Sequence, residues 1–535
     1  MTPPVLESTV DHPLEPPTVG GTWDLGRVLL VGVLTAGLLY IASAVTTDLS
    51  IVRSSNAWPF VLLGIALLIA LGFEFVNGFH DTANAVATVI YTHSMPPHAA
   101  VVWSGVWNFV GVMVASGAVA FTIVSLLPVE LILQVSAGAG FAMVFALLVA
   151  AIIWNLATWH FGIPSSSSHA LIGSIIGVGL TNQLLAAKAT DTSGVDWSQA
   201  AGVAKSLLLS PMIGFSIAAF LLLLLMKAIP IDRLYRPPRG KTPPPWWIRG
   251  LLILTCTGVS FAHGSNDGQK GMGLIMLILI GTVPTAYALN RAVDPSYVPL
   301  YVDRSMHAEQ VLSRHLAGQE SREPYRDAVG QYVRTRHLQP GTVAAVRALS
   351  ADIRQNIASF GSVAKIPLDQ TSNVRNDMYL LSESLRWMDR NGEPAFSRAE
   401  REVLLTYRAV LDQATKYIPA WVKTAVALAL GLGTMIGWRR IVVTVGEKIG
   451  KTHLSYGQGA CAEFVAMGTI GAADIFGLPV STTHVLSSGV AGTMAANRSG
   501  LQWSTVRHLL LAWVLTLPAS IAISGLLFWL FRQLA

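Results

Sequence analysis

Apolar segments long enough to cross a lipid bilayer recur along most of this chain, and they restrict its fold more than any other feature. A helix needs about 20 predominantly apolar residues to cross the hydrocarbon core. Clear segments of this kind begin near Gly26, Trp58, Ala99, Ala139, Ala200, Ile248, Ile418 and Trp503. The composition agrees, since 52% of the residues are hydrophobic and 12% are charged. We therefore expect an all-α polytopic membrane protein with about 10 to 12 transmembrane spans.

Positive charge collects in short loops beside these apolar segments. The loop 230–249 carries Arg233, Arg236, Arg239, Lys241 and Arg249, and a second basic stretch carries Arg439, Arg440, Lys448 and Lys451. Loops rich in Lys and Arg stay on the cytoplasmic side of bacterial membranes. This rule explains the net charge of +6 without a nucleic-acid partner. We expect both basic loops to be cytoplasmic.

Two pairs of polar motifs indicate an internal duplication. GFEFVNGFHDTANAVATVIYT (72–92) and GVSFAHGSNDGQKGMG (258–273) each place an aspartate, Asp81 or Asp267, in apolar sequence. GIPSSSSHALIGS (162–174) and GLPVSTTHVLSSG (477–489) share a Gly-x-Pro, a run of hydroxyl residues and a histidine. The aspartate motif and the hydroxyl motif are separated by many more residues in the second half of the chain than in the first. The additional length matches that of the long polar stretch 290–417.

The duplication predicts six regions along the chain. They are an N-terminal tail with an extra transmembrane helix (1–57), a first repeat (58–229), a basic cytoplasmic linker (230–249), the start of a second repeat (250–289), an inserted soluble helical domain (290–417) and the remainder of the second repeat (418–535). In the insertion, Ser397 and Glu400 have capping-box spacing before an apolar helical stripe. One crossing on each side of the insertion would place it outside the cytoplasm.

The hydroxyl motifs are typical of helix starts, because Pro164 and Pro479 are each followed by potential N-cap residues. A helix N-terminus offers free N–H groups and a positive dipole end, which suit an oxyanion. One such run alone would indicate capping or helix packing. Its recurrence with the same proline and the same trailing histidine, His169 or His484, favours a binding site shared by two helix ends.

Asp81 and Asp267 need a functional explanation, because a carboxylate at membrane depth is costly and usually marks an ion or proton path. Polar, glycine-containing segments in corresponding positions of two repeats are typical of discontinuous helices in secondary transporters. His80, His169, His263 and His484 recur around the motifs and could take part in proton transfer, since histidine titrates near neutral pH. A structural role in a hydrogen-bond network is the alternative for each of these residues.

NGFHDTANAVATVIYT, AHGSNDGQKG, GIPSSSSH and GLPVSTTH resemble the signature segments of the PiT family of inorganic phosphate transporters, in particular the bacterial low-affinity Pit type. The resemblance implies a multi-pass protein of the bacterial inner membrane with an inverted-repeat fold, broken helices and two re-entrant helical hairpins that hold phosphate between them. The phosphate ligands that it implies are Ser166, Ser167, Ser168, Ser481, Thr482, Thr483, Asn84 and Asn266. It also implies that Asp81 and Asp267 complete the site and form the cation or proton sites.

The second aspartate motif departs from the sodium-coupled members of this family. Their two motifs both resemble Asp-x-x-Asn, whereas here Asp267 is followed by Gly268, Gln269 and Lys270. A lysine ammonium has only donors and cannot bind sodium. Lys270 would instead pair with Asp267 or attract the phosphate. We therefore expect proton-coupled symport, as the resemblance to the Pit type also implies, with Asp81 or Asp267 as the titrating group.

The same resemblance implies that phosphate travels as a neutral complex with a divalent metal. We expect no catalytic residues, no bound cofactor and no metal site of the protein's own; the metal would enter with phosphate and keep much of its water. Homo-oligomerisation stays open.

Three other functions remain open from the sequence. A permease for sulfate or another tetrahedral oxyanion would have the same fold, although ionised aspartates would favour a protonated anion. An intramembrane serine hydrolase would use an activated serine, but the second hydroxyl motif has threonines. A phosphate channel or sensor would lack accumulation against a gradient.

Overall fold

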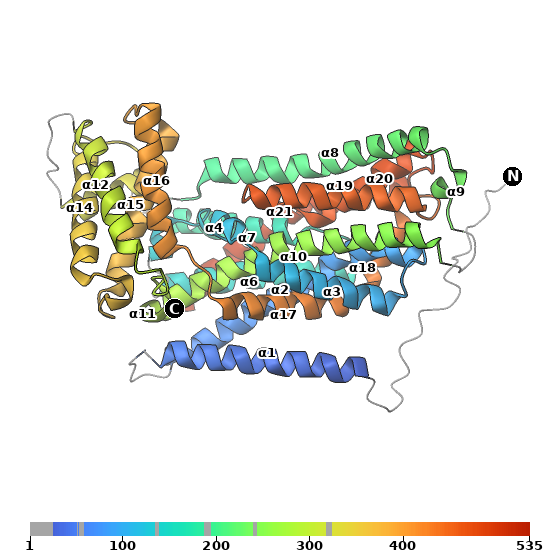
Figure 1. Cartoon of the computed structure of the whole chain (residues 1–535), viewed down its shortest axis with the longest axis horizontal. Helices are drawn as coiled ribbons and strands as arrows, with labels where there is room; N and C mark the ends of the chain where they lie inside the picture. Colours follow the sequence, from blue (N-terminus) through green and yellow to red (C-terminus); the bar gives the residue numbers. More distant parts are fainter. Residues whose placement is uncertain are drawn as a thin grey trace.

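The computed structural model of the chain describes residues 25–50, 52, 58–133, 138–186, 194–238, 243–316 and 324–534. Within these ranges every regular element is a helix, and one isolated β-bridge joins Gly450 to Leu501. Long helices lie side by side along a common axis, and a smaller helical bundle stands at one end of them (Figure 1).

The elongated body is built from the two halves of the chain. The first half contributes α2 (Trp58–Tyr91), α3 (Pro97–Val114), α4 (Ala118–Val124), α5 (Val129–Leu133), α6 (Gly138–His160), α7 (Ser167–Leu185) and α8 (Trp197–Ala228). The short α9 (Asp232–Tyr235) follows in the basic loop. The second half contributes α10 (Trp246–Thr282), α11 (Pro284–Tyr287), α17 (Ala420–Met435), α18 (Arg439–Val443), the π-helical turn η3 (Thr444–Lys448), α19 (Tyr456–Ile475), α20 (Thr482–Ala496) and α21 (Trp503–Leu534).

Helix packing in one half has its counterpart in the other half. Helix α2 packs on α17 as α10 packs on α3, and α7 packs on α21 as α20 packs on α8. The helix pairs α6–α7 and α19–α20 each form a hairpin around a hydroxyl motif. Helices α8 and α21 also carry one interior proline each, Pro211 and Pro518. The duplication in the sequence therefore extends to the packing, while inversion of one repeat relative to the other stays a prediction.

Small residues set the helix crossings that hold the two aspartates. A Cβ at Gly78 would overlap the carbonyl oxygen of Leu430 in α17, and a Cβ at Gly264 would overlap that of Asn108 in α3. Each glycine lies three residues before its aspartate, Asp81 or Asp267. Close backbone approach through small residues is the usual way in which membrane helices pack. The same crossing therefore positions each aspartate in its repeat.

The helices that carry the aspartates are continuous, which differs from the expected interruption at these motifs. Helix α2 runs for 34 residues and α10 for 37 residues. Neither polar segment contains proline, and glycine weakens a helix without removing its hydrogen bonds. The polar side chains find partners on neighbouring helices, and the backbone hydrogen bonds of α2 and α10 continue through both segments. The interruptions lie instead at the hydroxyl motifs, between α6 and α7 and between α19 and α20.

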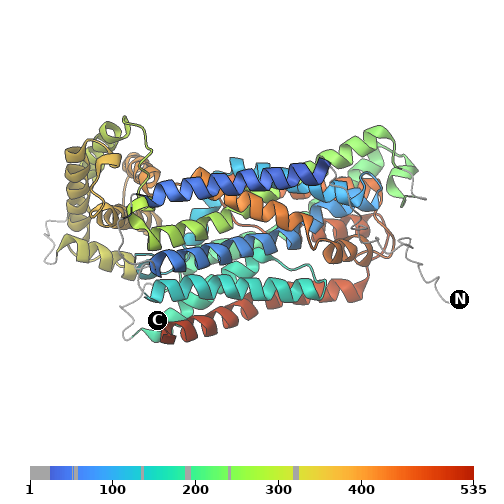
Figure 2. The ribbon, with the colours of Figure 1, turned by 90° about the horizontal axis from the view of Figure 1, so that it is seen from below.

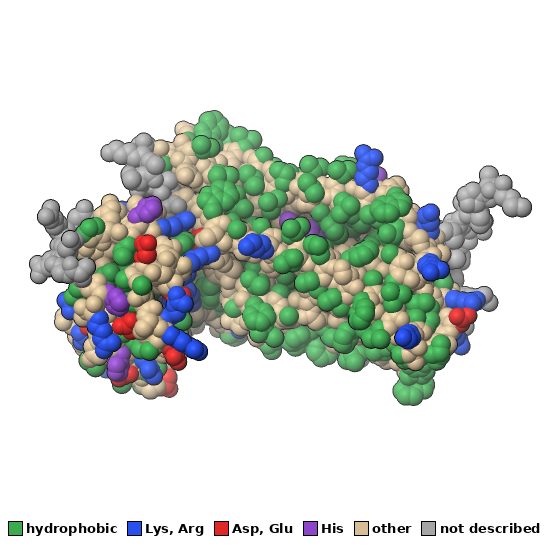
Figure 3. Space-filling view, turned by 90° about the horizontal axis from the view of Figure 1, so that it is seen from above, with side chains coloured by type: hydrophobic (Ala, Val, Ile, Leu, Met, Phe, Trp, Pro, Cys, Tyr) green, Lys and Arg blue, Asp and Glu red, His purple; other side chains and the backbone are tan. Residues whose placement is uncertain are grey.

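Six of the described helices are long and apolar enough to cross a membrane, or up to seven if the bent pair α16–α17 counts as one span. Helix α10 is not among them because its polar segment lowers its mean hydropathy, and α17 and α20 are short, with 16 and 15 residues. Hydrophobic side chains cover most of the visible face of the long body (Figure 3). The chain is a multi-pass helical membrane protein, and the full count of about 10 to 12 spans stays a prediction.

The described residues of 289–316 and 324–414 form the smaller bundle, which has a core of its own. Its helices are α12 (Tyr297–Ser313), α13 (Tyr325–Thr335), α14 (Thr342–Phe360), α15 (Thr371–Asn391) and α16 (Arg398–Thr415), with a short 3-10 turn η2 (Val363–Lys365). The predicted capping box of Ser397 and Glu400 is confirmed at the start of α16. Hydrogen bonds from the Ser397 backbone and side chain lower the pKa of Glu400 to about 2.

The bundle and the basic loops lie at opposite ends of the body. Helices α9 and α18 mark the basic end, and α12, α14 and α16 mark the other (Figure 1). At the basic end, Arg440 donates to the carbonyl of His160 at 2.5 Å, and Arg249 donates to that of Ser94 at 2.8 Å. Helix α1 (Leu25–Leu49) runs along the outside of the body and contacts α17 (Figures 1 and 2). If the basic end is cytoplasmic, the bundle is extracytoplasmic.

Cysteine labelling tests this orientation, because both native cysteines, Cys256 and Cys461, are buried. We expect Ser359→Cys, on the exposed surface of α14, to react with a membrane-impermeant maleimide in intact cells. Lys451→Cys, exposed at the basic end, should react only after the membrane is permeabilised. The reverse pattern would place the bundle in the cytoplasm.

Candidate functional site

The two hydroxyl motifs form matching helix starts. Ser166 caps α7, where its Oγ accepts the backbone N–H of His169 at 3.2 Å. Ser481 caps α20, where its Oγ accepts the backbone N–H of His484 at 3.2 Å. Both caps have extended backbone, as N-cap residues do. The prediction that each motif begins a helix is confirmed, and the hydroxyls that follow lie in the first turns.

The side chain of Asp81 joins these two helix starts. Ser167 of α7 donates its hydroxyl to Asp81 Oδ2 at 2.6 Å, and Thr483 of α20 donates its hydroxyl to Asp81 Oδ1. Asp81 is 3% exposed, and both hydroxyl residues are fully buried. A carboxylate is therefore bound between two positive helix ends, in the environment that the sequence predicts for an oxyanion.

Ser167 also connects this carboxylate to residues that the sequence did not single out as site residues. Its Oγ lies 2.6 Å from Asn77 Oδ1, and Asn77 Nδ2 donates to Glu74 Oε2 at 3.5 Å. Glu74 and Asn77 are fully buried. They share one face of α2 with Asp81, because their spacings are three and four residues. That spacing is the signal that could have identified both.

Lys270 links the second aspartate motif to the first hydroxyl motif. Its ammonium lies 2.7 Å from Asp267 Oδ1 and donates to Ser168 Oγ at 2.5 Å. Ser168 in turn donates to the backbone carbonyl of Val480, just before the second motif, at 2.8 Å. Lys270 and Asp267 are both fully buried. A buried pair of this kind is sensitive to the loss of either partner, because the remaining charge is left uncompensated.

His80 and His263 lie beside the two aspartates, at ion-pair distances. His263 Nε2 lies 3.5 Å from Asp267 Oδ2 and 4.0 Å from Asp81 Oδ2, and His80 Nδ1 lies 3.8 Å from Asp81 Oδ1. His263 Nδ1 lies 2.6 Å from Asn108 Oδ1, a contact that fixes its ring. Both were, like His169 and His484, candidates for proton transfer from the sequence, but their position beside the aspartates was not predicted.

His169 and His484 pack together behind the two hydroxyl motifs. Their ring centroids are 4.6 Å apart, and His484 stacks on Trp513 with a centroid distance of 4.1 Å. These aromatic contacts account for both rings as packing groups at the junction of α7, α20 and α21. A role in proton coupling stays a prediction.

The remaining predicted ligands differ in what they contact. Asn266 donates to the carbonyl of Leu478 at 3.1 Å and so holds the loop before the second hydroxyl motif. Its Oδ1 and the Thr482 hydroxyl are buried without a hydrogen-bond partner among the described residues. Asn84 belongs to α2, but its side chain lies outside the described residues. Asn266 and Thr482 therefore each retain a polar atom that a ligand could use.

One group of side chains could hold a cation. Ligand atoms of Asp81, His263 and Asp267 all lie within 4.8 Å of one another. The Lys270 ammonium already supplies a positive charge 2.7 Å from Asp267. We therefore assign no metal to this group.

Comparison with known proteins identifies the family of this chain. The phosphate transporter family profile matches residues 77–524. The low-affinity inorganic phosphate transporter PitB of Escherichia coli (strain K12) is 42% identical over 491 residues, which cover 89% of this chain and 97% of PitB. PitA of the same strain is 42% identical over 495 residues, 88% of this chain and 97% of PitA.

A more distant relative and a solved structure were also found. A low-affinity inorganic phosphate transporter of Buchnera aphidicola subsp. Acyrthosiphon pisum is 40% identical over 485 residues, 88% of this chain and 96% of the relative. A solved sodium-dependent phosphate transporter aligns with a TM-score of 0.49 and 18% identity, over 89% of this chain and 100% of that chain. On the family profile and these sequence identities, the chain belongs to the phosphate transporter family.

Proposed function

We propose that this chain is an inorganic phosphate transporter of the bacterial inner membrane that moves phosphate together with protons. Its family and its relatives support phosphate transport and a transporter rather than an enzyme, so the serine-hydrolase alternative is set aside. The observation that carries proton coupling is the position of Asp81, which accepts hydroxyls from both hydroxyl motifs.

Asp81 and phosphate would compete for the same donors. The ionised carboxylate engages the Ser167 and Thr483 hydroxyls, and its charge would repel an anion placed between the two helix ends. A proton on Asp81 removes that charge and leaves both hydroxyls available to phosphate. Phosphate binding and proton binding would therefore favour each other, which is the linkage that symport requires.

Lys270 supports a proton rather than sodium as the coupling ion. Its ammonium pairs with Asp267 at 2.7 Å, so the second aspartate motif contains a fixed cation of its own. An additional sodium ion beside it would meet like-charge repulsion. The same ammonium touches Ser168 and would add attraction for a bound phosphate.

We also propose that phosphate enters as a complex with a divalent metal such as magnesium. A neutral complex lowers the cost of placing phosphate at membrane depth. Magnesium keeps several waters when it is held through phosphate oxygens, so the protein need not supply a full set of ligands.

Phosphate binding should depend on Ser167 and not on its neighbour along the same helix. Ser167→Ala removes a hydroxyl that faces Asp81, whereas Ser174→Ala removes one that bonds back to the Ala170 carbonyl of α7. Because a hydrogen bond to a charged group contributes about 1.5 to 3 kcal/mol, phosphate affinity should fall roughly 10-fold to 100-fold in Ser167→Ala. Equilibrium binding of radiolabelled phosphate to the purified protein measures this.

Two outcomes of that experiment would contradict the proposal. Equal losses in Ser167→Ala and Ser174→Ala would indicate a general effect on α7 rather than a ligand. Full displacement of phosphate by sulfate would keep the fold and the site but favour the alternative of a permease for sulfate or a related oxyanion.

Uptake into proteoliposomes tests the coupling ion. The wild-type protein should accumulate phosphate under an imposed proton gradient with magnesium present, and added sodium should not change the rate. Lys270→Asn creates the Asp-x-x-Asn pattern and removes the fixed cation, so uptake should become stimulated by sodium, while the proton drive that depends on Asp81 should remain. Strict sodium dependence of the wild-type protein would overturn proton coupling, and the absence of accumulation would favour a channel or sensor.

A further inference from the structure

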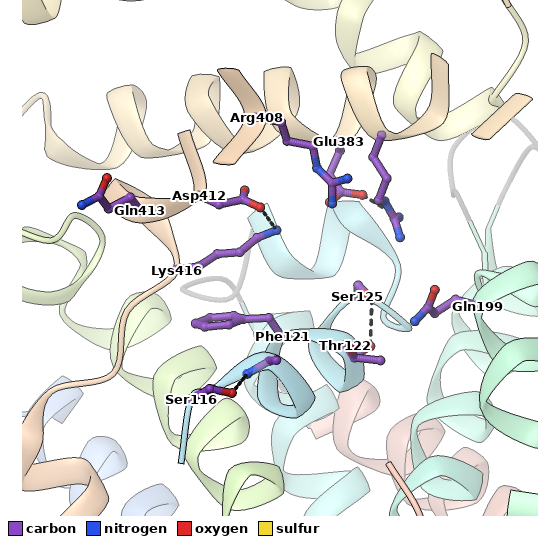
Figure 4. A pocket seen from close by; sticks show the side chains of 13 residues that line it. Ser116, Phe121, Thr122, Ser125, Gln199, Glu383, Arg408, Asp412, Gln413 and Lys416 are labelled. Carbon is purple, nitrogen blue, oxygen red and sulfur yellow. Dashed lines mark hydrogen bonds and ion pairs between the residues drawn. The ribbon is translucent and has the colours of Figure 1, made fainter. Parts of the chain in front are cut away.

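A cavity of about 510 Å³ lies where the helical bundle meets the membrane-spanning body. Its lining comes from α4 and the loop before it on one side and from α15 and α16 on the other (Figure 4). Its volume is within the range of small-molecule sites. We call this cavity the vestibule and define it by Phe121, Thr122, Ser125, Arg386, Arg408 and Lys416.

Two of the three cations in the vestibule are already paired. Lys416 bonds to Asp412 at 2.9 Å, and Arg386 bonds to Glu383 at 2.6 Å and to Asp196 at 3.3 Å. Asp196 precedes α8 and caps it, so this network also attaches the bundle to the body. The charges of Arg386 and Lys416 are thus largely balanced within the protein.

Arg408 differs from its neighbours. Among the described residues it has no ion pair. Its Nε, like that of Arg386, is buried without a hydrogen-bond partner. Its side chain extends from α16 toward the cavity, while Thr122 of α4 and Ser125, directly after α4, lie across from it (Figure 4). A planar guanidinium with unused donors matches the oxygens of a phosphate, and hydroxyls add further donors. Glu383 and Asp412 also line the vestibule, but they pair with Arg386 and Lys416, so Arg408 adds a positive charge that suits an oxyanion.

Helix α4 separates the vestibule from the central site. On its buried face, the Val119 N–H donates to Gln269 Oε1 at 2.9 Å, and Gln269 directly precedes Lys270. Ala118 also packs against Gly477 in the loop that leads to the second hydroxyl motif. One short helix of seven residues is thus shared by the outer cavity and the polar centre.

We propose that the vestibule is a first binding site for inorganic phosphate, with Arg408 as its anion contact, on the path to the central site. This inference rests on the proposed function and gives the inserted bundle a role in it. An arginine at the entrance binds phosphate oxygens directly, in the free anion or in its metal complex, so it raises the local concentration of the substrate and speeds its capture. The vestibule therefore acts at low phosphate concentration and has little effect once the central site is saturated.

Transport kinetics separate this role from a structural one. Arg408→Ala should raise the KM for phosphate about threefold to tenfold without a change in kcat, because the contact is only partly desolvated. Arg408→Lys keeps the charge and loses the planar fork, so its KM should lie between the two. Arg398→Ala, on the exposed start of the same helix, should behave like the wild-type protein. A lower kcat with an unchanged KM in Arg408→Ala would overturn the proposal.

Protection from labelling locates phosphate directly. Gln413→Cys places a thiol in the vestibule wall, and a neutral maleimide reports its accessibility. Inorganic phosphate should slow labelling in the otherwise wild-type protein and also in the Ser167→Ala background, but not in the Arg408→Ala background. Chloride at equal ionic strength serves as the control.

The outcomes of the labelling experiment distinguish the vestibule from the central site. Protection that disappears with Ser167→Ala would come from the central site and would overturn the vestibule. Absence of protection in every background, with phosphate binding at the central site intact, would overturn the vestibule and leave the proposed function standing. Loss of central binding itself would instead contradict the proposed function.

Discussion

The structure depends on a buried carboxylate held between the N-termini of two helices. Asp81 accepts hydroxyls from Ser167 at the start of α7 and from Thr483 at the start of α20, and these helices belong to different repeats. A charge at membrane depth is tolerated only where such partners surround it. The crossing at Gly78 presses α2 against α17 and sets the place of this carboxylate. Both repeats are therefore needed to complete one site.

The duplicated site is not symmetric in its charges. The Asp81 carboxylate meets hydroxyls, whereas the Asp267 carboxylate meets the ammonium of Lys270, which also reaches Ser168. One half thus presents a carboxylate that a proton can neutralise, and the other presents a carboxylate that is already neutralised. Under the proposed proton coupling, these unequal charges would give the first repeat the coupling role and the second a fixed positive charge beside phosphate.

Much of this arrangement followed from local sequence. The apolar segments predicted a helical membrane protein, and the hydroxyl motifs after Pro164 and Pro479 predicted helix starts. For Lys270 the sequence left two roles open, a pair with Asp267 and attraction of phosphate, and the pair is present. The sequence did not predict that α2 and α10 are continuous, because glycine-rich polar segments break helices only when their side chains lack partners elsewhere. Those partners, such as Asn108 beside His263, come from helices distant in sequence.

Other features of the site could be identified only from the tertiary structure. Glu74 and Asn77 contact each other and lie on the same face of α2 as Asp81. The contact of Asn77 with Ser167, however, depends on where α7 begins. The cavity between the bundle and the body depends on how α15 and α16 are positioned relative to α4. Hydrophobic periodicity within a helix does not predict the relative position of such distant segments. Spacing within a helix and a site shared by two helix ends were therefore predictable, whereas the contacts that distant helices make around that site were not.

The most direct test of proton linkage is the number of protons taken up when phosphate binds to the purified protein. Calorimetry in buffers of different ionisation enthalpy measures it, and comparison with Asp81→Asn removes the titration of phosphate itself. The wild-type protein should take up about one more proton per bound phosphate than Asp81→Asn. Equal proton uptake by the two proteins, with phosphate binding intact in both, would contradict the account.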